Sequence, residues 1–252
     1  MNSRYDLSAA GDDSQTVTPT VTSIEDIRVQ GLNAENAADI ITYDGGSTTG
    51  AVRIVANGFS GDAAGFGGLA VTNVTTDVAF GIRGGNGNAD HSVTYDAVTG
   101  ADDQATVEFS NEGQANLLTI NGIETTSLSV SGTNNSITDI SADAVETLLV
   151  TGDGAVTVTE LDQNNANLTT IDASENSGGA TLGADGDFVL GTVTAITGGT
   201  GDDTVHLNRV NVAADDTIDG GECVDTLQFD GGTTAAASAI GPVEILVCGP
   251  LH

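Results

Sequence analysis

The sequence predicts an all-β chain whose C-terminal half is a right-handed parallel β-helix or β-roll solenoid. Short runs of Val, Ile, Thr and Phe alternate with Gly, Asn and Asp breaks from about residue 21 onward, which is typical of strands between turns. A unit of about 22 residues recurs after residue 116, and such a period indicates stacked coils. The 34 glycines, few aromatic residues and absence of Trp favour a core of small side chains.

The chain divides into three parts. Residues 1–20 are polar and are interpreted as an N-terminal tail or linker. Residues 21–115 are predicted to form a β-rich domain, either solenoid or β-sandwich, because their strand-length runs show no clean period. Residues 116–252 are predicted to form a parallel β-helix that carries calcium-binding turns.

Strands are expected wherever β-branched residues form runs bounded by turn residues. In the second part, the runs are Ala51–Val55, Leu69–Val74, Asp77–Ile82, Ser92–Tyr95 and Ala105–Phe109. Only residues 33–41 and 61–65 are candidates for brief helices.

The repeat is visible in three similar lines that begin at Ile123, Val145 and Leu168, at steps of about 22 residues. Units of this length cannot bury an apolar face alone, so they stack. With about three short strands in each unit, we expect a core of Val, Ile, Leu, Ala and Thr ladders. The end coils of a solenoid expose unpaired backbone, so we expect the C-terminal end to meet another domain or another copy.

The most informative motif is a pair of glycine-rich turns at residues 198–206 and 220–228. The first, GGTGDDTVH, fits the calcium-binding nonapeptide G-G-x-G-x-D-x-U-x at every fixed position. The second, GGECVDTLQ, differs only at Cys223. The copies are one repeat length apart, and Ile196 and Ile218 precede them in the same register.

Each residue type in this motif suits a hard cation. Glycine permits a tight turn that aims carbonyl oxygens at one point, and Ca²⁺ prefers carbonyl and carboxylate oxygens. Asp203 and Asp225 are expected on neighbouring rungs, about 5 Å apart, where they would repel by about 3 kcal/mol and a cation would relieve the strain. Metal-free Gly/Asp turns are the alternative. We therefore expect Ca²⁺ as the cofactor, held by Gly199, Gly201, Asp202, Asp203, Asp219, Gly221 and Asp225.

Weaker features favour ordinary structural roles. Residues 84–90 and 100–103 resemble the calcium turns only in part, and ordinary turns are the preferred interpretation. Cys223 and Cys248 are too few for a disulfide scaffold, so two small apolar fillers are preferred over a bridge between coils.

Charge restricts the partners. The chain has 36 Asp and Glu against 5 Arg and no Lys, for a formal net charge of −31, which excludes nucleic acid and acidic lipid as favourable partners. No apolar run is long enough to insert into a membrane. Residues 1–20 lack a secretory signal pattern. Three alternatives for export stay open: a signal outside this sequence, a C-terminal signal, or no export at all.

A resemblance to a known family rests on the lines Ile123–Gly132 and Val145–Gly152, the segment Thr170–Gly179 and the two glycine-rich turns. In these stretches the chain resembles calcium-binding bacterial surface-layer proteins with repeats-in-toxin nonapeptides. The resemblance extends from about residue 21. It implies secretion from a Gram-negative-type cell, a calcium-dependent β-rich structure and a two-dimensional lattice on the extracellular surface. A cell-surface polysaccharide anchor would belong to a part outside this sequence. Cys223 and the short tandem depart from the family pattern.

We therefore expect a structural protein that forms a homo-oligomer or lattice in a calcium-dependent way, and no enzyme. A stalk segment of a secreted calcium-dependent adhesin is the alternative, because the same solenoid would serve as a stiff spacer. A β-helical polysaccharide lyase is disfavoured. It would need Arg or Lys beside an acidic sugar, and the five arginines lie far apart in sequence. His91 and His206 have no visible catalytic partner.

Overall fold

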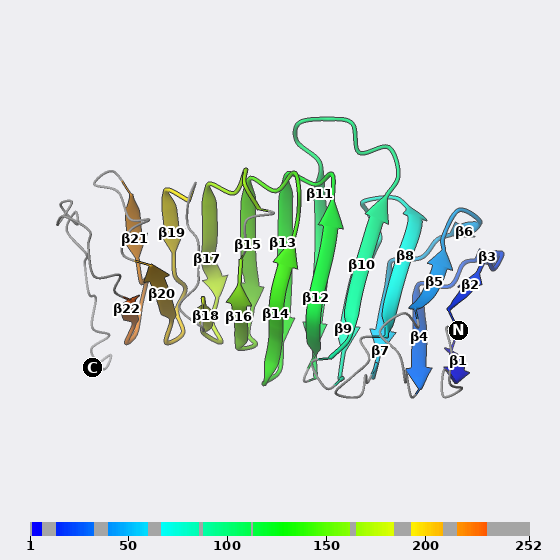
Figure 1. Cartoon of the computed structure of the whole chain (residues 1–252), viewed down its shortest axis with the longest axis horizontal. Coiled ribbons are helices and arrows are strands. Elements are labelled where there is room, and N and C mark those ends of the chain that lie inside the picture. The colour runs from blue at the N-terminus through cyan, green and yellow to red at the C-terminus, as the bar shows by residue number, and fades with distance from the viewer. Residues whose placement is uncertain are drawn as a thin grey trace.

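The computed structural model is a parallel β-solenoid whose strands stack in chain order along the long axis of the molecule (Figure 1). No helix occurs within the part of the chain that is described. The structure describes residues 2–6, 14–32, 40–59, 67–85, 88–111, 113–161, 165–183, 193–208 and 216–230.

Two parallel sheets of ten strands each make up the solenoid, and each coil contributes one strand to each sheet. Sheet A contains, in spatial order, β1 (Asn2–Asp6), β4 (Asp26–Leu32), β7 (Arg53–Asn57), β9 (Ala79–Arg83), β11 (Gln104–Ser110), β13 (Thr125–Ser131), β15 (Thr147–Gly152), β17 (Thr170–Asn176), β19 (Ala195–Thr197) and β21 (Thr217–Asp219). Sheet B contains β2 (Gln15–Val17), β5 (Ile40–Asp44), β8 (Gly68–Val74), β10 (Asp90–Tyr95), β12 (Gln114–Asn121), β14 (Asn135–Ser141), β16 (Val156–Glu160), β18 (Ala180–Leu182), β20 (Thr204–Asn208) and β22 (Thr226–Asp230). A short third sheet pairs β3 (Val21–Thr22) with β6 (Thr48–Thr49).

The register of strand pairing confirms the repeat expected in the C-terminal half. Thr125 pairs with Thr147, and Thr147 pairs with Thr170, as the predicted step requires. Ile196 pairs with Ile218 one coil later. The apolar lines of the sequence are therefore successive rungs of one stack.

The N-terminal half is also solenoid, so the β-sandwich alternative for residues 21–115 is wrong. Its coils are longer than those of the C-terminal half, because Asp26 pairs with Arg53 and Ile40 pairs with Gly68. These longer and unequal coils explain why no clean period is visible there. Both sheets continue across residue 116, and residues 1–20 contribute β1 and β2 to their first edges.

The expectation of three strands in each coil is wrong for most of the solenoid. In the coil that begins at Thr125 and ends before Thr147, β13 and β14 take seven residues each. The few residues left form two turns, so a third strand has no room, and the coil is flattened into two facing sheets. Of the two helix candidates, residues 33–39 and 61–65 lie outside the described residues, whereas Ile40 and Ile41 begin β5.

Alternation along each strand fills the space between the sheets. In β11, Ala105, Val107 and Phe109 are buried, whereas the intervening side chains face outward. The buried apolar side chains form one cluster that runs through successive coils. The expected Val, Ile, Leu and Ala ladders are confirmed, and Phe80 and Phe109 add bulk.

Polar side chains buried at the corners connect one coil to the next. These buried corner side chains are His91, Asn135, Asn165, Asn176 and Asp203. Each one hydrogen-bonds the backbone of the preceding coil. For example, the Gly113 N–H donates to Asn135 Oδ1 at 3.1 Å. A buried N–H left without an acceptor costs about 1–3 kcal/mol, so these side chains hold the turns of adjacent coils in register.

His91 is the corner side chain whose ionisation is expected to make stability depend on pH. Its Nδ1 accepts the Leu69 N–H at 3.2 Å, so the ring is neutral at that nitrogen. The side chain is 2% exposed and lies edge-on to Phe59 and Phe80. Burial lowers the pKa of His91 to about 4.

Stability is therefore expected to fall as the pH drops from the ordinary pKa of histidine toward the lowered pKa of His91. As the pH falls, this histidine takes up a proton in the unfolded state before it does so in the folded state. The free energy of unfolding should therefore fall by about 2 kcal/mol between pH 7 and pH 5. The variant His91→Asn keeps an acceptor at the δ position without titrating there. Urea unfolding at pH 7 and pH 5 should show that the variant loses about 2 kcal/mol less unfolding free energy between these pH values than the wild type does. Equal losses in the two proteins would contradict this role.

Candidate functional site: two glycine-rich turns and an arginine cluster

The two glycine-rich turns are stacked on each other, as the sequence predicts. Residues 198–203 connect β19 to β20, and residues 220–225 connect β21 to β22. Asp203 and Asp225 directly precede Thr204 and Thr226, which pair in the ladder. The two aspartates are therefore neighbours on adjacent coils.

Asp203 connects its own turn to the preceding coil. The side chain is 4% exposed. One carboxylate oxygen accepts the Gly199 N–H at 2.7 Å, and the other accepts the Ala180 N–H at 2.6 Å. Asp203 is thus the charged member of the buried corner side chains.

Asp225 repeats this arrangement one coil later, but only in part. Its Oδ1 accepts the Asp203 N–H at 2.9 Å. Its Oδ2 is buried and has no hydrogen-bond partner in the described part of the chain. A buried carboxylate oxygen without a donor is an energetic cost, and a cation is the kind of group that would remove it.

Glycines in the first turn are required by close contact between coils. A Cβ atom at Gly199 would lie 1.9 Å from the Asn176 carbonyl oxygen, and one at Gly201 would lie 2.4 Å from the Gly179 nitrogen. No larger residue fits without moving the backbone. In the second turn, the corresponding Cys223 has φ of 80°, a left-handed conformation that suits glycine.

The remaining predicted ligands lie in the same two turns. Asp202 Oδ1 accepts the Val224 N–H, and Asp219 Oδ1 accepts the Gly221 N–H, both at 3.1 Å. All seven predicted residues therefore lie in or directly beside these two adjacent turns. No three His, Cys, Asp or Glu side chains among the described residues form a metal-binding group by themselves, so backbone carbonyls would have to complete a calcium shell.

The electrostatics of the turns include the predicted repulsion between carboxylates, but burial has a larger effect on the pKa of Asp203. Burial raises the pKa of Asp203 above its ordinary value, the Ala180 and Gly199 N–H groups oppose this rise, and the charges of Asp225 and Asp202 add to it. The sequence prediction included the like charges but not the backbone donors. Those donors hold the carboxylate in place whether or not a cation is bound.

In both weaker motifs, an aspartate accepts a hydrogen bond from a described residue. Asp103 Oδ2 accepts the Gly100 N–H at 3.0 Å, which closes that turn internally. Asp90 Oδ1 accepts the Asn116 side-chain amide at 2.8 Å. Cys248 lies outside the described residues, so pairing with Cys223 stays an open question.

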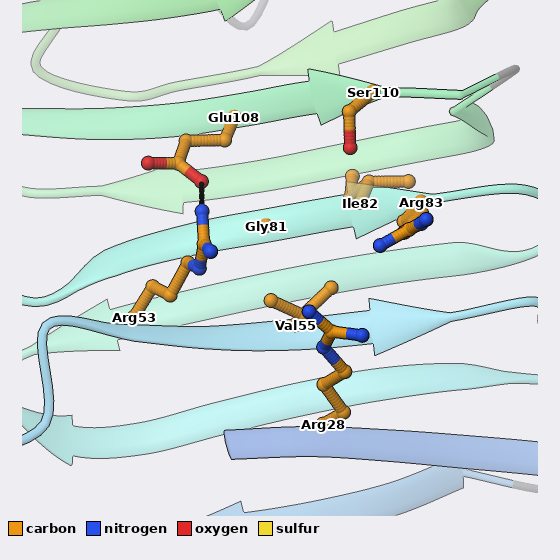
Figure 2. A pocket seen from close by; sticks show the side chains of 8 residues that line it. All are labelled: Arg28, Arg53, Val55, Gly81, Ile82, Arg83, Glu108 and Ser110. Atoms are coloured by element: carbon orange, nitrogen blue, oxygen red, sulfur yellow. Dashed lines mark hydrogen bonds and ion pairs between the residues drawn. The ribbon is translucent and has the colours of Figure 1, made fainter. Parts of the chain in front are cut away.

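A second cluster, absent from the predictions, lies on the outward face of sheet A. Arg28, Arg53 and Arg83 lie on the adjacent strands β4, β7 and β9, and Figure 2 shows them around a small depression beside Gly81. The depression has a volume of about 50 Å³. We call these three residues the arginine cluster.

Two carboxylates neutralise part of the arginine cluster. Arg53 contacts Glu108 at 3.0 Å and Asp26 at 3.2 Å, and Arg28 contacts Asp26 at 2.9 Å. Hydrogen bonding from Arg28 lowers the pKa of Asp26. The guanidinium group of Arg83 has no ion pair or hydrogen bond with any described residue (Figure 2). Three positive charges thus face two negative ones.

The spacing of the arginines was the signal that sequence reasoning missed. The step from Arg28 to Arg53 is slightly shorter than the coil that pairs Asp26 with Arg53, and the step from Arg53 to Arg83 is slightly longer. The three residues therefore recur at about one coil length of that half. Although the five arginines lie far apart in sequence, the fold therefore brings these three onto adjacent strands.

Comparisons with known proteins add no family. No family model matches the chain, and no curated protein or solved structure matches it either. Within the described residues, no helix is long and apolar enough to cross a membrane.

Replacing Cys223 by Gly should stabilise the second turn. The left-handed backbone at this position costs a residue with a Cβ atom about 1 kcal/mol. The variant Cys223→Gly should therefore raise the free energy of unfolding by a similar amount, as measured by chemical denaturation in a chelator. Gly221→Ala is the matched control. Its φ is 87° and its new Cβ atom would lie 2.2 Å from the Gly199 carbonyl oxygen, so it should destabilise. Destabilisation by both changes would refute the assigned turn geometry.

Proposed function

We propose that this chain is a structural protein of the extracellular cell surface that binds Ca²⁺ at its two stacked turns and self-associates in a calcium-dependent way, as surface-layer proteins do. The observation that supports this most directly is the pair Asp203 and Asp225 on adjacent coils, with Asp225 Oδ2 buried and without a donor. A doubly charged ion would satisfy that oxygen and offset the repulsion between the carboxylates.

The donor chemistry of the turns fits calcium. Asp225 Oδ2 would be the central ligand, and backbone carbonyls of the turn glycines would complete the shell, because Asp202 and Asp219 do not form a three-carboxylate group with it. Ca²⁺ accepts six to eight such oxygens in irregular geometry. When bound, the ion supplies the positive charge that the turns lack. The amides of Gly199 and Ala180 keep Asp203 oriented toward the coil boundary.

The charge of the whole chain would make association sensitive to divalent ions. A formal charge of −31 makes two copies repel at long range. Divalent cations that bind the acidic surface reduce this repulsion, and assembly then depends on their concentration. The protein would accordingly form a lattice or larger homo-oligomer in calcium and lose that larger assembly in a chelator.

A calcium-set stalk of a secreted adhesin is the second candidate. The uninterrupted stack of ten strands in each sheet favours it, because such a stack is a stiff spacer. Electron microscopy of the protein in calcium distinguishes the two. Ordered sheets support the surface-layer function, and isolated fibres or monomers support the stalk.

Calcium should stabilise the folded chain through the two turns. At a free calcium concentration 100 times the Kd, linkage predicts about 2.7 kcal/mol of added unfolding free energy. The variant Asp225→Asn keeps the Oδ1 acceptor but removes the charge, so it should weaken calcium binding at least tenfold in isothermal titration calorimetry. The control Asp153→Asn makes the same charge change at an exposed position in another turn and should bind calcium as the wild type does.

Two outcomes would contradict this proposal. One is a melting temperature and assembly state that are the same in calcium and in EDTA. The other is equal loss of calcium binding in Asp153→Asn and Asp225→Asn, which would indicate diffuse binding to an acidic surface instead of a site in the turns.

A further inference from the structure

We propose that the outward face of sheet A is a contact surface between two copies of this chain, in which the arginine cluster of each copy binds Asp172 and Glu175 of the other. This contact does not involve the calcium turns. It would provide a charge-specific attraction within a molecule whose net charge is strongly repulsive.

The outward face of sheet A has opposite charges at its two ends. One row of paired residues crosses seven strands. In spatial order it consists of Arg28, Val55, Gly81, Glu108, Ser129, Thr151 and Glu175. A second row includes Arg53 near one end and continues through Thr106, Ser127, Leu149 and Asp172. The arginines lie toward the N-terminal end, and Asp172 and Glu175 lie on β17.

The arginine cluster is suited to receive one carboxylate. Arg83 lacks an ion-pair partner in the described part of the chain, and the side chains of Arg28 and Arg53 are 40% and 41% exposed. Gly81 leaves a gap in the row, and the depression of about 50 Å³ beside it exceeds the space that one water molecule needs. A bidentate contact from arginine to carboxylate is among the stronger polar contacts in proteins.

Strand β17 presents the matching acids without local cations. Glu175 is exposed, and Asp172 accepts the Ser174 N–H at 2.9 Å, which orients its carboxylate. The two acids line a shallow depression with Leu149 and Thr151. No Arg or Lys occurs anywhere between residues 84 and 208. This end of the face is therefore uniformly acidic.

Symmetry determines how two copies can use this face. Consider a two-fold axis that lies in the contact plane, runs parallel to the strands and passes between β11 and β13. Strands β7 and β17 are equally far from this axis, so β7 of one copy lies over β17 of the other. Each row then lies over the same row of the second copy. Arg53 faces Asp172, and Glu175 lies over Val55, at the rim of the depression that Arg83 also lines. The other in-plane axis, along the stack, would place like charges together.

The size of the face predicts a weak dimer. From β4 to β17 the face extends about 29 Å along the stack, and a five-residue strand gives it a width of about 17 Å. About 500 Å² of each copy would be covered, or about 1,000 Å² in total, which is at the low end for specific contacts. The Ser and Thr side chains between the charged ends allow the sheets to approach closely.

The test is a pair of charge reversals, Arg83→Glu and Glu175→Arg. Self-association is measured by sedimentation equilibrium in EDTA at 150 mM salt, where screening over about 8 Å reduces long-range repulsion but preserves close pairs. The wild type should dimerise, and each variant alone should dimerise at least tenfold more weakly, because both of its symmetric contacts then join like charges. An equimolar mixture of the two variants should associate as strongly as the wild type, because both contacts then join opposite charges.

The control Asp96→Arg makes the same charge change as Glu175→Arg but lies in an exposed turn that follows β10 of sheet B, so it should dimerise at least as well as the wild type. Circular dichroism checks that every variant is folded. The proposal is overturned if the wild type stays monomeric up to about 1 mM, or if the mixture fails to recover association. It is also overturned if the face binds oligogalacturonate, with loss in Arg83→Glu, while no dimer forms. Because EDTA is present throughout, failure here leaves the calcium proposal untouched.

Discussion

Stacking in this solenoid depends on acceptors for the backbone N–H groups that the corners leave outside the regular ladders. Parallel strands satisfy one another along the sheets, but each turn exposes amides to a buried boundary between coils. Most of the buried corner side chains supply the missing acceptors, as Asn135 does for Gly113 and His91 does for Leu69, whereas Asn176 donates to carbonyl oxygens instead. An amide without an acceptor would cost about as much as several buried methylene groups contribute. The corners therefore determine which coils can lie next to each other.

The glycine-rich turns use the same device with a charged side chain. Asp203 accepts two amides, whereas an asparagine can offer a single acceptor oxygen, so the turn is held more tightly. The cost is a buried negative charge beside that of Asp225, and this cost is visible in the raised pKa of Asp203. The same turns thus hold a structural carboxylate at Asp203 and an unsatisfied carboxylate oxygen at Asp225, and this is why we infer that calcium would affect the cohesion of coils. The arginine cluster has a different role, because it concentrates positive charge on one face of an acidic molecule.

Much of the C-terminal solenoid could be predicted because its coils are nearly equal in length. Thr125, Thr147 and Thr170 recur at steps that match the ladder, and the nonapeptide identifies which aspartates meet. The N-terminal coils vary in length, so Arg28, Arg53 and Arg83 recur only approximately at a coil length, although the fold places them on adjacent strands. The partners of a buried carboxylate are also invisible in sequence when they are backbone amides, since every residue except proline carries one. That is why the donors to Asp203 were missed although Asp203 itself was identified.

Residue-resolved hydrogen exchange tests most directly whether charged corners couple coil stacking to calcium. The amide of Asp203 donates to charged Asp225, and the amide of Gly113 donates to neutral Asn135. Our account predicts that both amides exchange slowly in calcium, and that in EDTA the Asp203 amide exchanges at least tenfold faster while the Gly113 amide is unchanged. Equal exchange of the Asp203 amide in calcium and in EDTA would contradict the coupling.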